Sequence, residues 1–244
     1  MHNSWARQLT DRLGYKNSIA AGKSGGGNRF IANAVIYEAH KAVSNGKIPD
    51  ITVMWSSPTR YEFPIHHKET PYYTDLYNKD TNDFNPGFYN RDDSSKRWLL
   101  GAGTNHLEFN VTKSKKVNHT YTEVFSNQMK YVWNAYNQWQ STLTSILLIQ
   151  SLCESNGWNY RFATFRDYVS EYRSHASEFP EFDNLIKWDK FTFTNDTTGG
   201  LREYTLANLN TWDDGYDNHP SAEAHADFLD NFWLKKHSGV YEVI

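Results

Sequence analysis

The chain has 244 residues, of which 39% are hydrophobic and 22% charged, and this composition suits one globular domain large enough to bury a sizeable core. Its formal net charge of -3 argues against a nucleic-acid-binding surface, and its single cysteine, Cys153, excludes an internal disulfide. No apolar run reaches transmembrane length and no signal peptide opens the chain, so we expect a cytoplasmic or virion-associated protein without a membrane partner.

The N-terminal segment predicts a helix, a strand and a second helix in succession. Apolar residues recur at helical spacing over residues 1–13, and Gly14 suits the position that ends such a helix. Residues 17–21 form an apolar run that predicts a short buried strand, and residues 29–44 predict a helix. A strand, a loop and a helix in this order form half of a βαβ unit.

A glycine-rich loop, residues 22–28 (GKSGGGN), separates that strand from the second helix. Lys23 and Ser24 precede the glycines instead of following them, so the order is wrong for a P-loop, and the glycine spacing does not match the dinucleotide-binding pattern. Glycines let backbone N–H groups approach a ligand, so the loop predicts an anion or oxyanion site at a helix N-terminus. The alternative is a flexible turn without a ligand.

Residues 50–57 predict a buried parallel strand, because an apolar β-branched run follows a Pro-Asp pair. The strand ends in Ser56 and Ser57, at the edge where open α/β sheets present their sites. The polar and aromatic residues 59–118 are interpreted as an insertion over the top of the sheet. A lid over a bound substrate is its functional interpretation, and a peripheral elaboration or an oligomer contact is the alternative.

The second half of the chain predicts helices alternating with strands. Strong apolar periodicity indicates one long helix packed on a core, and shorter patterns indicate the other elements. The predicted elements are a helix over residues 120–155, a strand over 158–165, a helix over 168–177, an edge strand over 191–194 and a helix over 222–236.

The stretch before the last helix holds a histidine with nearby carboxylates. Ser221 is a good N-cap for that helix, and Pro220 favours an extended backbone at His219. Asp217 and Asp214 lie two and five residues before His219, so the stretch has the parts of a general base and its orienting acid. The alternative is a turn that carries a surface histidine.

The sequence Asp217-Asn218-His219-Pro220-Ser221 resembles the last conserved block of the SGNH (GDSL-type) hydrolases. In that family the block supplies the Asp and His of a Ser-His-Asp triad, so the resemblance implies His219 as the base and Asp217 as its partner. Asp214 is the alternative partner.

Two earlier segments also resemble SGNH blocks. Gly22, Ser24 and Asn28 are similar to the second block, whose glycine donates a backbone N–H to the oxyanion. The strand over residues 50–57 corresponds by position to the third block, which usually ends in Gly-x-Asn-Asp with the Asn as a second oxyanion donor. That Asn is absent here, so the resemblance leaves its role to Ser56, Ser57 or Arg60. Loss of one such donor costs on the order of 10² to 10³ in rate.

The first SGNH block, a strand ending in the Gly-Asp-Ser nucleophile, has no counterpart in this sequence. We therefore expect a truncated or inactive form, in which the first strand of the sheet is also missing. Loss of a triad nucleophile costs on the order of 10⁶ in turnover. His66 and His67 lack zinc-ligand spacing, so no metal site is expected.

The resemblance implies an α/β fold, a three-layer α/β/α sandwich with a short flavodoxin-like parallel sheet, in a single domain over residues 1–244. It also implies hydrolysis of a small-molecule or glycan ester, including acyl groups linked to carbohydrate, without a cofactor. The alternative is a non-catalytic SGNH-like binding or structural module. The strand end Trp55–Arg60 resembles SGNH-like proteins encoded by phages. The sequence leaves the acyl substrate and the oligomeric state open.

Overall fold

The computed structural model describes residues 5–15, 18–21, 27–66, 89–90, 96–102, 135–174, 178–209 and 220–239. The elements in chain order are α1 (Trp5–Leu13), α2 (Asn28–Ser44), β1 (Asp50–Trp55), β2 (Arg60–His66), β3 (Tyr89–Asn90), β4 (Lys96–Ala102), α5 (Ala135–Asn156), β5 (Asn159–Thr164), α6 (Tyr168–Ser174), α7 (Pro180–Leu185), η2 (Trp188–Lys190), α8 (Leu201–Leu209), α9 (Ala222–Asp227), η3 (Phe228–Trp233) and α10 (Leu234–Lys236). The fold is mixed α/β.

The chain divides into two compact units. The first unit comprises Met1–Gly22, Ala34–Ser56 and Leu147–Ile244, and the second comprises Lys23–Asn33 and Ser57–Ile146. Helices α2 and α5 each contribute residues to both units. The expectation of a single domain over residues 1–244 stays a prediction.

A two-stranded parallel sheet lies at the centre of the first unit. β1 pairs with β5 in a register that runs from Asp50 opposite Asn159 to Trp55 opposite Thr164. Both strands were predicted from their apolar runs, and both are confirmed. Alternate β1 residues are fully buried, whereas nearly all of β5 is buried. This burial is typical of a parallel strand covered on both faces.

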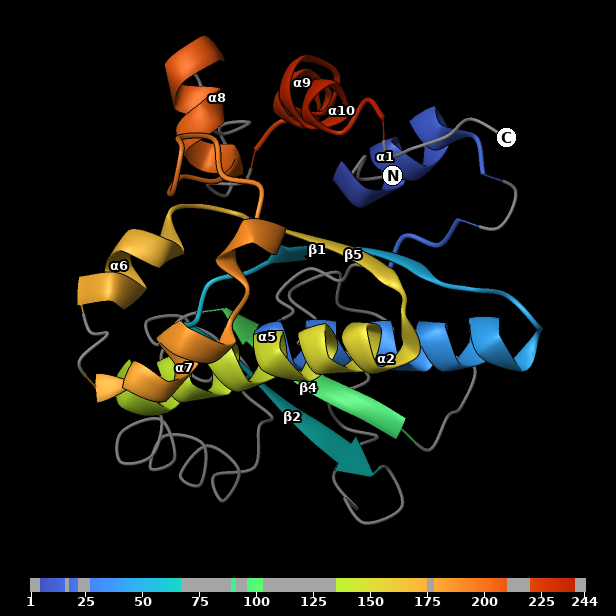
Figure 1. Cartoon of the computed structure of the whole chain (residues 1–244). Coiled ribbons are helices and arrows are strands. Elements are labelled where there is room, and N and C mark those ends of the chain that lie inside the picture. The colour runs from blue at the N-terminus through green and yellow to red at the C-terminus, as the bar shows by residue number, and fades with distance from the viewer. Residues whose placement is uncertain are drawn as a thin grey trace, which may run out of the picture. The chain divides into compact units, whose positions relative to one another are not determined.

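Helices lie on both sides of the β1–β5 pair within the first unit. α1, α8, α9 and α10 lie on one side, and the parts of α2 and α5 that belong to this unit lie on the other (Figure 1). The core on the α1 side brings together apolar residues from α1, β5, α8, α9 and η3: the buried members are Leu9, Ala163, Leu201, Phe228, Leu229 and Trp233. The helices predicted over residues 1–13 and 222–236 are confirmed in the parts that the structure describes, whereas α8 was not predicted.

The second unit contains a three-stranded antiparallel sheet that the sequence analysis missed. Its strand order is β2-β4-β3, and β2 pairs with β4 from Arg60 opposite Ala102 to His66 opposite Lys96. All three strands lie within residues 59–118, for which we had predicted no strand and only an insertion over the top of the sheet. The signal was available, because apolar and polar residues alternate from Arg60 to His66.

One predicted strand is wrong and another is reduced to a single bridge. Residues 18–21 form no strand, and the Ile19 side chain is 53% exposed. Among the described residues no segment pairs with them, so their apolar side chains lack a sheet to pack on. In the predicted edge strand over residues 191–194, Phe191 forms one parallel bridge with Phe162, and Thr192 N donates to Phe162 O at 2.8 Å.

Candidate functional site

Five of the predicted site residues, His219, Asp217, Asp214, Gly22 and Ser24, lie outside the described residues. Their roles therefore stay predictions. In the first unit, the described candidate segments are the helix that begins after His219 and the carboxyl ends of β1 and β5. In the second unit they are the segments around Asn28 and Ser57, and each unit is described by itself.

The helix after His219 begins where the sequence predicted. Pro220 is buried, and the Ser221 side chain accepts a hydrogen bond from Ala224 N at 3.1 Å. An N-cap of this kind satisfies one of the backbone donors that a helix start leaves free. The chain is consequently anchored one residue after the candidate base.

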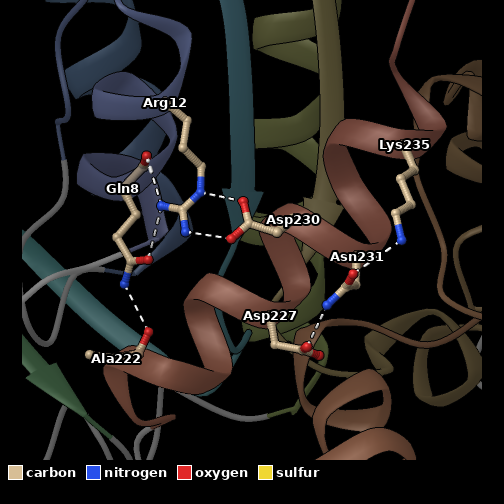
Figure 2. Close-up of polar contacts among 7 residues, drawn as sticks. All are labelled: Gln8, Arg12, Ala222, Asp227, Asp230, Asn231 and Lys235. Atoms are coloured by element: carbon tan, nitrogen blue, oxygen red, sulfur yellow. Dashed lines mark hydrogen bonds and ion pairs between the residues drawn. The ribbon is translucent and has the colours of Figure 1, made fainter.

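Polar contacts hold this helix against α1, as Figure 2 shows. Gln8 Nε2 donates to Ala222 O at 2.9 Å, and Arg12 Nη2 donates to Asp230 Oδ2 at 2.7 Å. Arg12 also donates to Gln8 Oε1 at 3.2 Å, so the three side chains form one network. The hydrogen bond from Arg12 lowers the pKa of the Asp230 carboxyl.

An open groove runs beside this network. Its volume is about 340 Å³, and it is lined by residues of α1 and α9: Gln8, Asp11, Arg12, Ala222, Glu223 and Ala226. Arg12, its one cationic lining residue, is already paired with Asp230. The lining residues therefore do not single out a ligand of one chemical class.

The middle of the C-terminal helix is wound as a π-helix, which the sequence analysis did not predict. The π segment η3 buries Phe228, Leu229 and Trp233 completely. Wider turns bring Trp233 back toward Phe228, and their ring centroids lie 6.2 Å apart. On the outer side, Asn231 donates to Asp227 and accepts from Lys235 (Figure 2).

The carboxyl ends of β1 and β5 lie together at one edge of the parallel pair. Ser56 follows β1 directly and is 7% exposed. The strand pairing continues one residue further, because Phe165 N donates to Trp55 O at 3.0 Å. Trp55 Nε1 and Thr164 Oγ1 are buried there without a hydrogen-bond partner. The predicted placement of polar residues at this edge is confirmed for Ser56.

Gly199 and Gly200, which we interpreted only as a loop, allow the start of α8 to pack closely against the end of β5. Gly199 has φ of +87°, and a Cβ on Gly200 would lie 2.3 Å from Thr164 O. Gly200 N donates to Glu203 Oε2 at 2.9 Å, so the Glu203 side chain caps the N-terminus of α8. Glutamate three residues after a Gly-Gly pair was the sequence signal for this helix N-terminus.

In the second unit, the predicted site residues that the structure describes form hydrogen bonds within that unit. Asn28 is 3% exposed and donates through Nδ2 to Thr142 Oγ1 at 3.0 Å. Ser57 Oγ lies 2.7 Å from Thr59 Oγ1 and accepts from Thr59 N, and Arg60 N donates to Ser57 O. The Asn28 amide and the Ser57 hydroxyl therefore already have partners in the fold. Their proposed contact with a substrate oxygen stays a prediction.

Two further groups with reactive side chains have structural roles. Cys153 is completely buried, and burial raises the pKa of its thiol to about 12, so the thiolate is absent at neutral pH. His237 Nε2 lies 2.9 Å from Thr192 Oγ1, and burial lowers the pKa of this imidazole to about 4, with smaller effects from Arg161 and Lys236. Thr192 is 4% exposed and His237 is partly exposed, and their hydrogen bond joins the segment after β5 to the end of the C-terminal helix.

Among the described residues, no three His, Cys, Asp or Glu side chains gather in a way that would hold a metal ion. Within the same part of the chain, every helix is too short or too polar to cross a membrane. Comparisons with protein-family models, with curated proteins and with solved structures give no match.

Proposed function

We propose that this chain has the SGNH-type fold and carries the general base, with its carboxylate partner, of a site that cleaves ester bonds. His219 is the general base, and Asp217 is the carboxylate that orients it, with Asp214 as the alternative. The observation that carries the proposal is the anchoring of the chain immediately after His219, where Pro220 is buried and Ser221 caps the next helix. A base acts efficiently only when its position is held by such packing.

The described architecture supports the fold part of this proposal. A parallel pair with helices on both sides is compatible with a three-layer α/β/α sandwich of flavodoxin-like topology (Figure 1). In open sheets of this kind, ligands bind outside the carboxyl ends of the strands. Ser56 lies at the carboxyl end of β1 and is a candidate for contact with the substrate.

The proposed chemistry uses side chains and backbone groups without a cofactor. The His219 imidazole takes a proton from the attacking hydroxyl or water, while Asp217 stabilises the imidazolium that forms. The backbone N–H of Gly22 stabilises the oxyanion, and Ser24, Ser56 and Arg60 are further candidates for this role. The substrate class is a small acyl ester, including an acyl group on a carbohydrate.

Hydrolysis of para-nitrophenyl acetate tests the proposal, because water activated by a positioned imidazole cleaves such an activated ester even without a serine nucleophile. We expect His219→Ala to lower the rate by about 10²-fold, the low end of a general base's contribution. His40→Ala is the matched control, since His40 is an exposed histidine of α2. Equal rates for the wild type and His219→Ala would exclude His219 as the base.

A non-catalytic binding module is the second candidate. It is favoured by the hydrogen bonds that already occupy the Asn28 amide and the Ser57 hydroxyl. If the wild type hydrolyses the ester no faster than buffer, while an acyl sugar still raises its melting temperature, the binding module replaces the hydrolase as the proposed function.

A further inference from the structure

Two buried polar atoms at the end of the parallel sheet have no hydrogen-bond partner in the part of the chain that the structure describes. They are the indole Nε1 of Trp55 and the hydroxyl Oγ1 of Thr164. Trp55 is the last residue of β1, and Thr164 is the last residue of β5. The two residues are 1% and 3% exposed. Most buried polar groups in proteins are hydrogen-bonded, and leaving one unpaired costs folding free energy. Two such atoms at one strand end therefore indicate a bound group.

These two side chains are neighbours on one face of the sheet. Trp55 and Thr164 are directly opposite each other in the parallel register. Side chains alternate between faces along a strand, so both share the face of Phe162, whose ring packs edge-on against Trp55 at 5.4 Å between centroids. The pair consequently lies at the carboxyl edge of the sheet, directly before Ser56 in the chain.

The chemistry of the two atoms restricts the ligand. An indole N–H only donates a hydrogen bond, and a threonine hydroxyl can donate one as well. Two donors on residues paired in register match an acceptor oxygen, and a cation is excluded as a ligand of the indole N–H. The apolar surroundings strengthen any hydrogen bond made there, which is the condition under which donors stabilise developing negative charge.

We propose that Trp55 Nε1 and Thr164 Oγ1 bind the carbonyl oxygen of the acyl substrate and the oxyanion that develops from it. They thereby take the role for which the third SGNH-like segment of this chain lacks an asparagine. This inference rests on the proposed function, because the acyl substrate comes from that proposal. Trp55 and Thr164 are then catalytic residues.

Titration with methylphosphonate, a tetrahedral anion that mimics the oxyanion, tests the binding directly by nuclear magnetic resonance. Trp55→Phe identifies the Trp55 indole signal by its loss. We expect that signal to move downfield with saturation, while the other tryptophan indole signals serve as internal controls. Thr164→Val should weaken binding about tenfold, as for loss of one hydrogen bond to a charged group, and Thr164→Ser should restore it. An unmoved Trp55 signal would overturn the inference.

Thermal unfolding without ligand gives a second test that does not depend on binding. Thr164→Val removes a buried hydroxyl that has no partner, so we expect an unchanged or higher melting temperature. Thr205→Val is the matched control, because the Thr205 hydroxyl is equally buried but donates to Leu201 O at 2.8 Å. This control should lower the melting temperature. Equal lowering by both variants would show that the Thr164 hydroxyl is paired, and the inference would fail.

The two proposals fail separately. If His219→Ala leaves ester hydrolysis unchanged while methylphosphonate still shifts the Trp55 signal, the general base is wrong and the oxygen-binding pair stands. If hydrolysis depends on His219 but methylphosphonate leaves the Trp55 signal in place, the hydrolase proposal stands and the oxygen-binding pair is rejected.

Discussion

Arg12 in α1 and Asp230 in η3 form a two-fold hydrogen-bonded ion pair across 218 positions of sequence (Figure 2). The guanidinium presents Nε and Nη2 to the two carboxylate oxygens, the geometry in which Arg–carboxylate pairs are strongest. The pair joins the first helix of the chain to the helix that follows His219. It is half exposed at Asp230, so its contribution to stability is limited by solvent.

Breaking this pair should destabilise the first unit modestly. We expect Asp230→Asn to lower the free energy of unfolding by about 1 kcal/mol, with the loss shrinking in high salt. Urea denaturation of the single and double variants with Arg12→Ala measures the coupling energy. The Arg7–Asp11 pair on the same helix is more exposed and is the control. We expect its coupling energy to be about 0.3 kcal/mol, as for i,i+4 pairs on helices. Equal coupling energies for the two pairs would contradict this prediction.

Removing the cap of the C-terminal helix should have an effect of similar size. Ser221→Ala loses the acceptor for Ala224 N, and we expect a loss of about 1 kcal/mol in the free energy of unfolding. Ser221→Asp keeps a capping oxygen and should restore stability. Because His219 lies two residues earlier, Ser221→Ala should also lower ester hydrolysis if the proposed base is correct. A loss equal for the alanine and aspartate variants would show that the cap is not the cause.

Substitution of Gly200 should damage the contact between α8 and β5. An added Cβ would lie 2.3 Å from Thr164 O and 2.9 Å from the Arg166 backbone, so backbone atoms must move. We expect Gly200→Ala to cost about 2 kcal/mol, within the range for overpacking a closed site. Gly239→Ala is the matched control, since nothing lies within 4 Å of its added Cβ. The melting temperatures of the two variants measure this difference. Equal melting temperatures would show that the Gly200 backbone does not lie as close to Thr164 O as described.

Stability should fall on mild acidification because of His237. Its pKa is lowered from 6.5 to about 4 in the folded chain, mainly by burial, so folding favours the neutral imidazole. In the unfolded chain this imidazole binds a proton below about pH 6.5. The stabilisation that the neutral His237 gives the folded chain is therefore complete above that pH and is lost as the pH falls toward 4.

Melting temperatures measured from pH 7.5 to pH 4.5 check this prediction. His237→Gln should flatten the decline between pH 6.5 and 4.5, whereas His40→Gln, at an exposed histidine of α2, should leave the decline as in the wild type. A His237→Gln variant with the wild-type slope would place the responsible proton elsewhere.

Local sequence patterns predicted the elements that depend on neighbouring residues. Helix α1 ends at Leu13 before Gly14, whose φ is +64°, and β1 and β5 follow their apolar runs. Residues 17–21 look equally like a strand in the sequence. The described residues 18–21 form none, because a strand also needs a partner, which no local pattern supplies.

The candidate site was predictable only in part. The Asp-x-His-Pro-Ser stretch and the polar end of β1 stand out in sequence, whereas the spacing of Gly200 and Glu203, which marks the start of α8, was not recognised. Trp55 was seen only as the last apolar residue of a strand. Its importance emerges from the unpaired Nε1 beside Thr164, which depends on which strand pairs with β1.

By itself, the sequence determined where α1 ends, where the C-terminal helix begins and where β1 and β5 run, since these features follow from residues a few positions apart. Only the tertiary structure decided that β1 pairs with β5, that Arg12 meets Asp230, and that Trp55 is paired in register with Thr164. The physical reason is that burial and hydrogen bonding are satisfied between distant segments, and their partners are set by the packing of the whole unit.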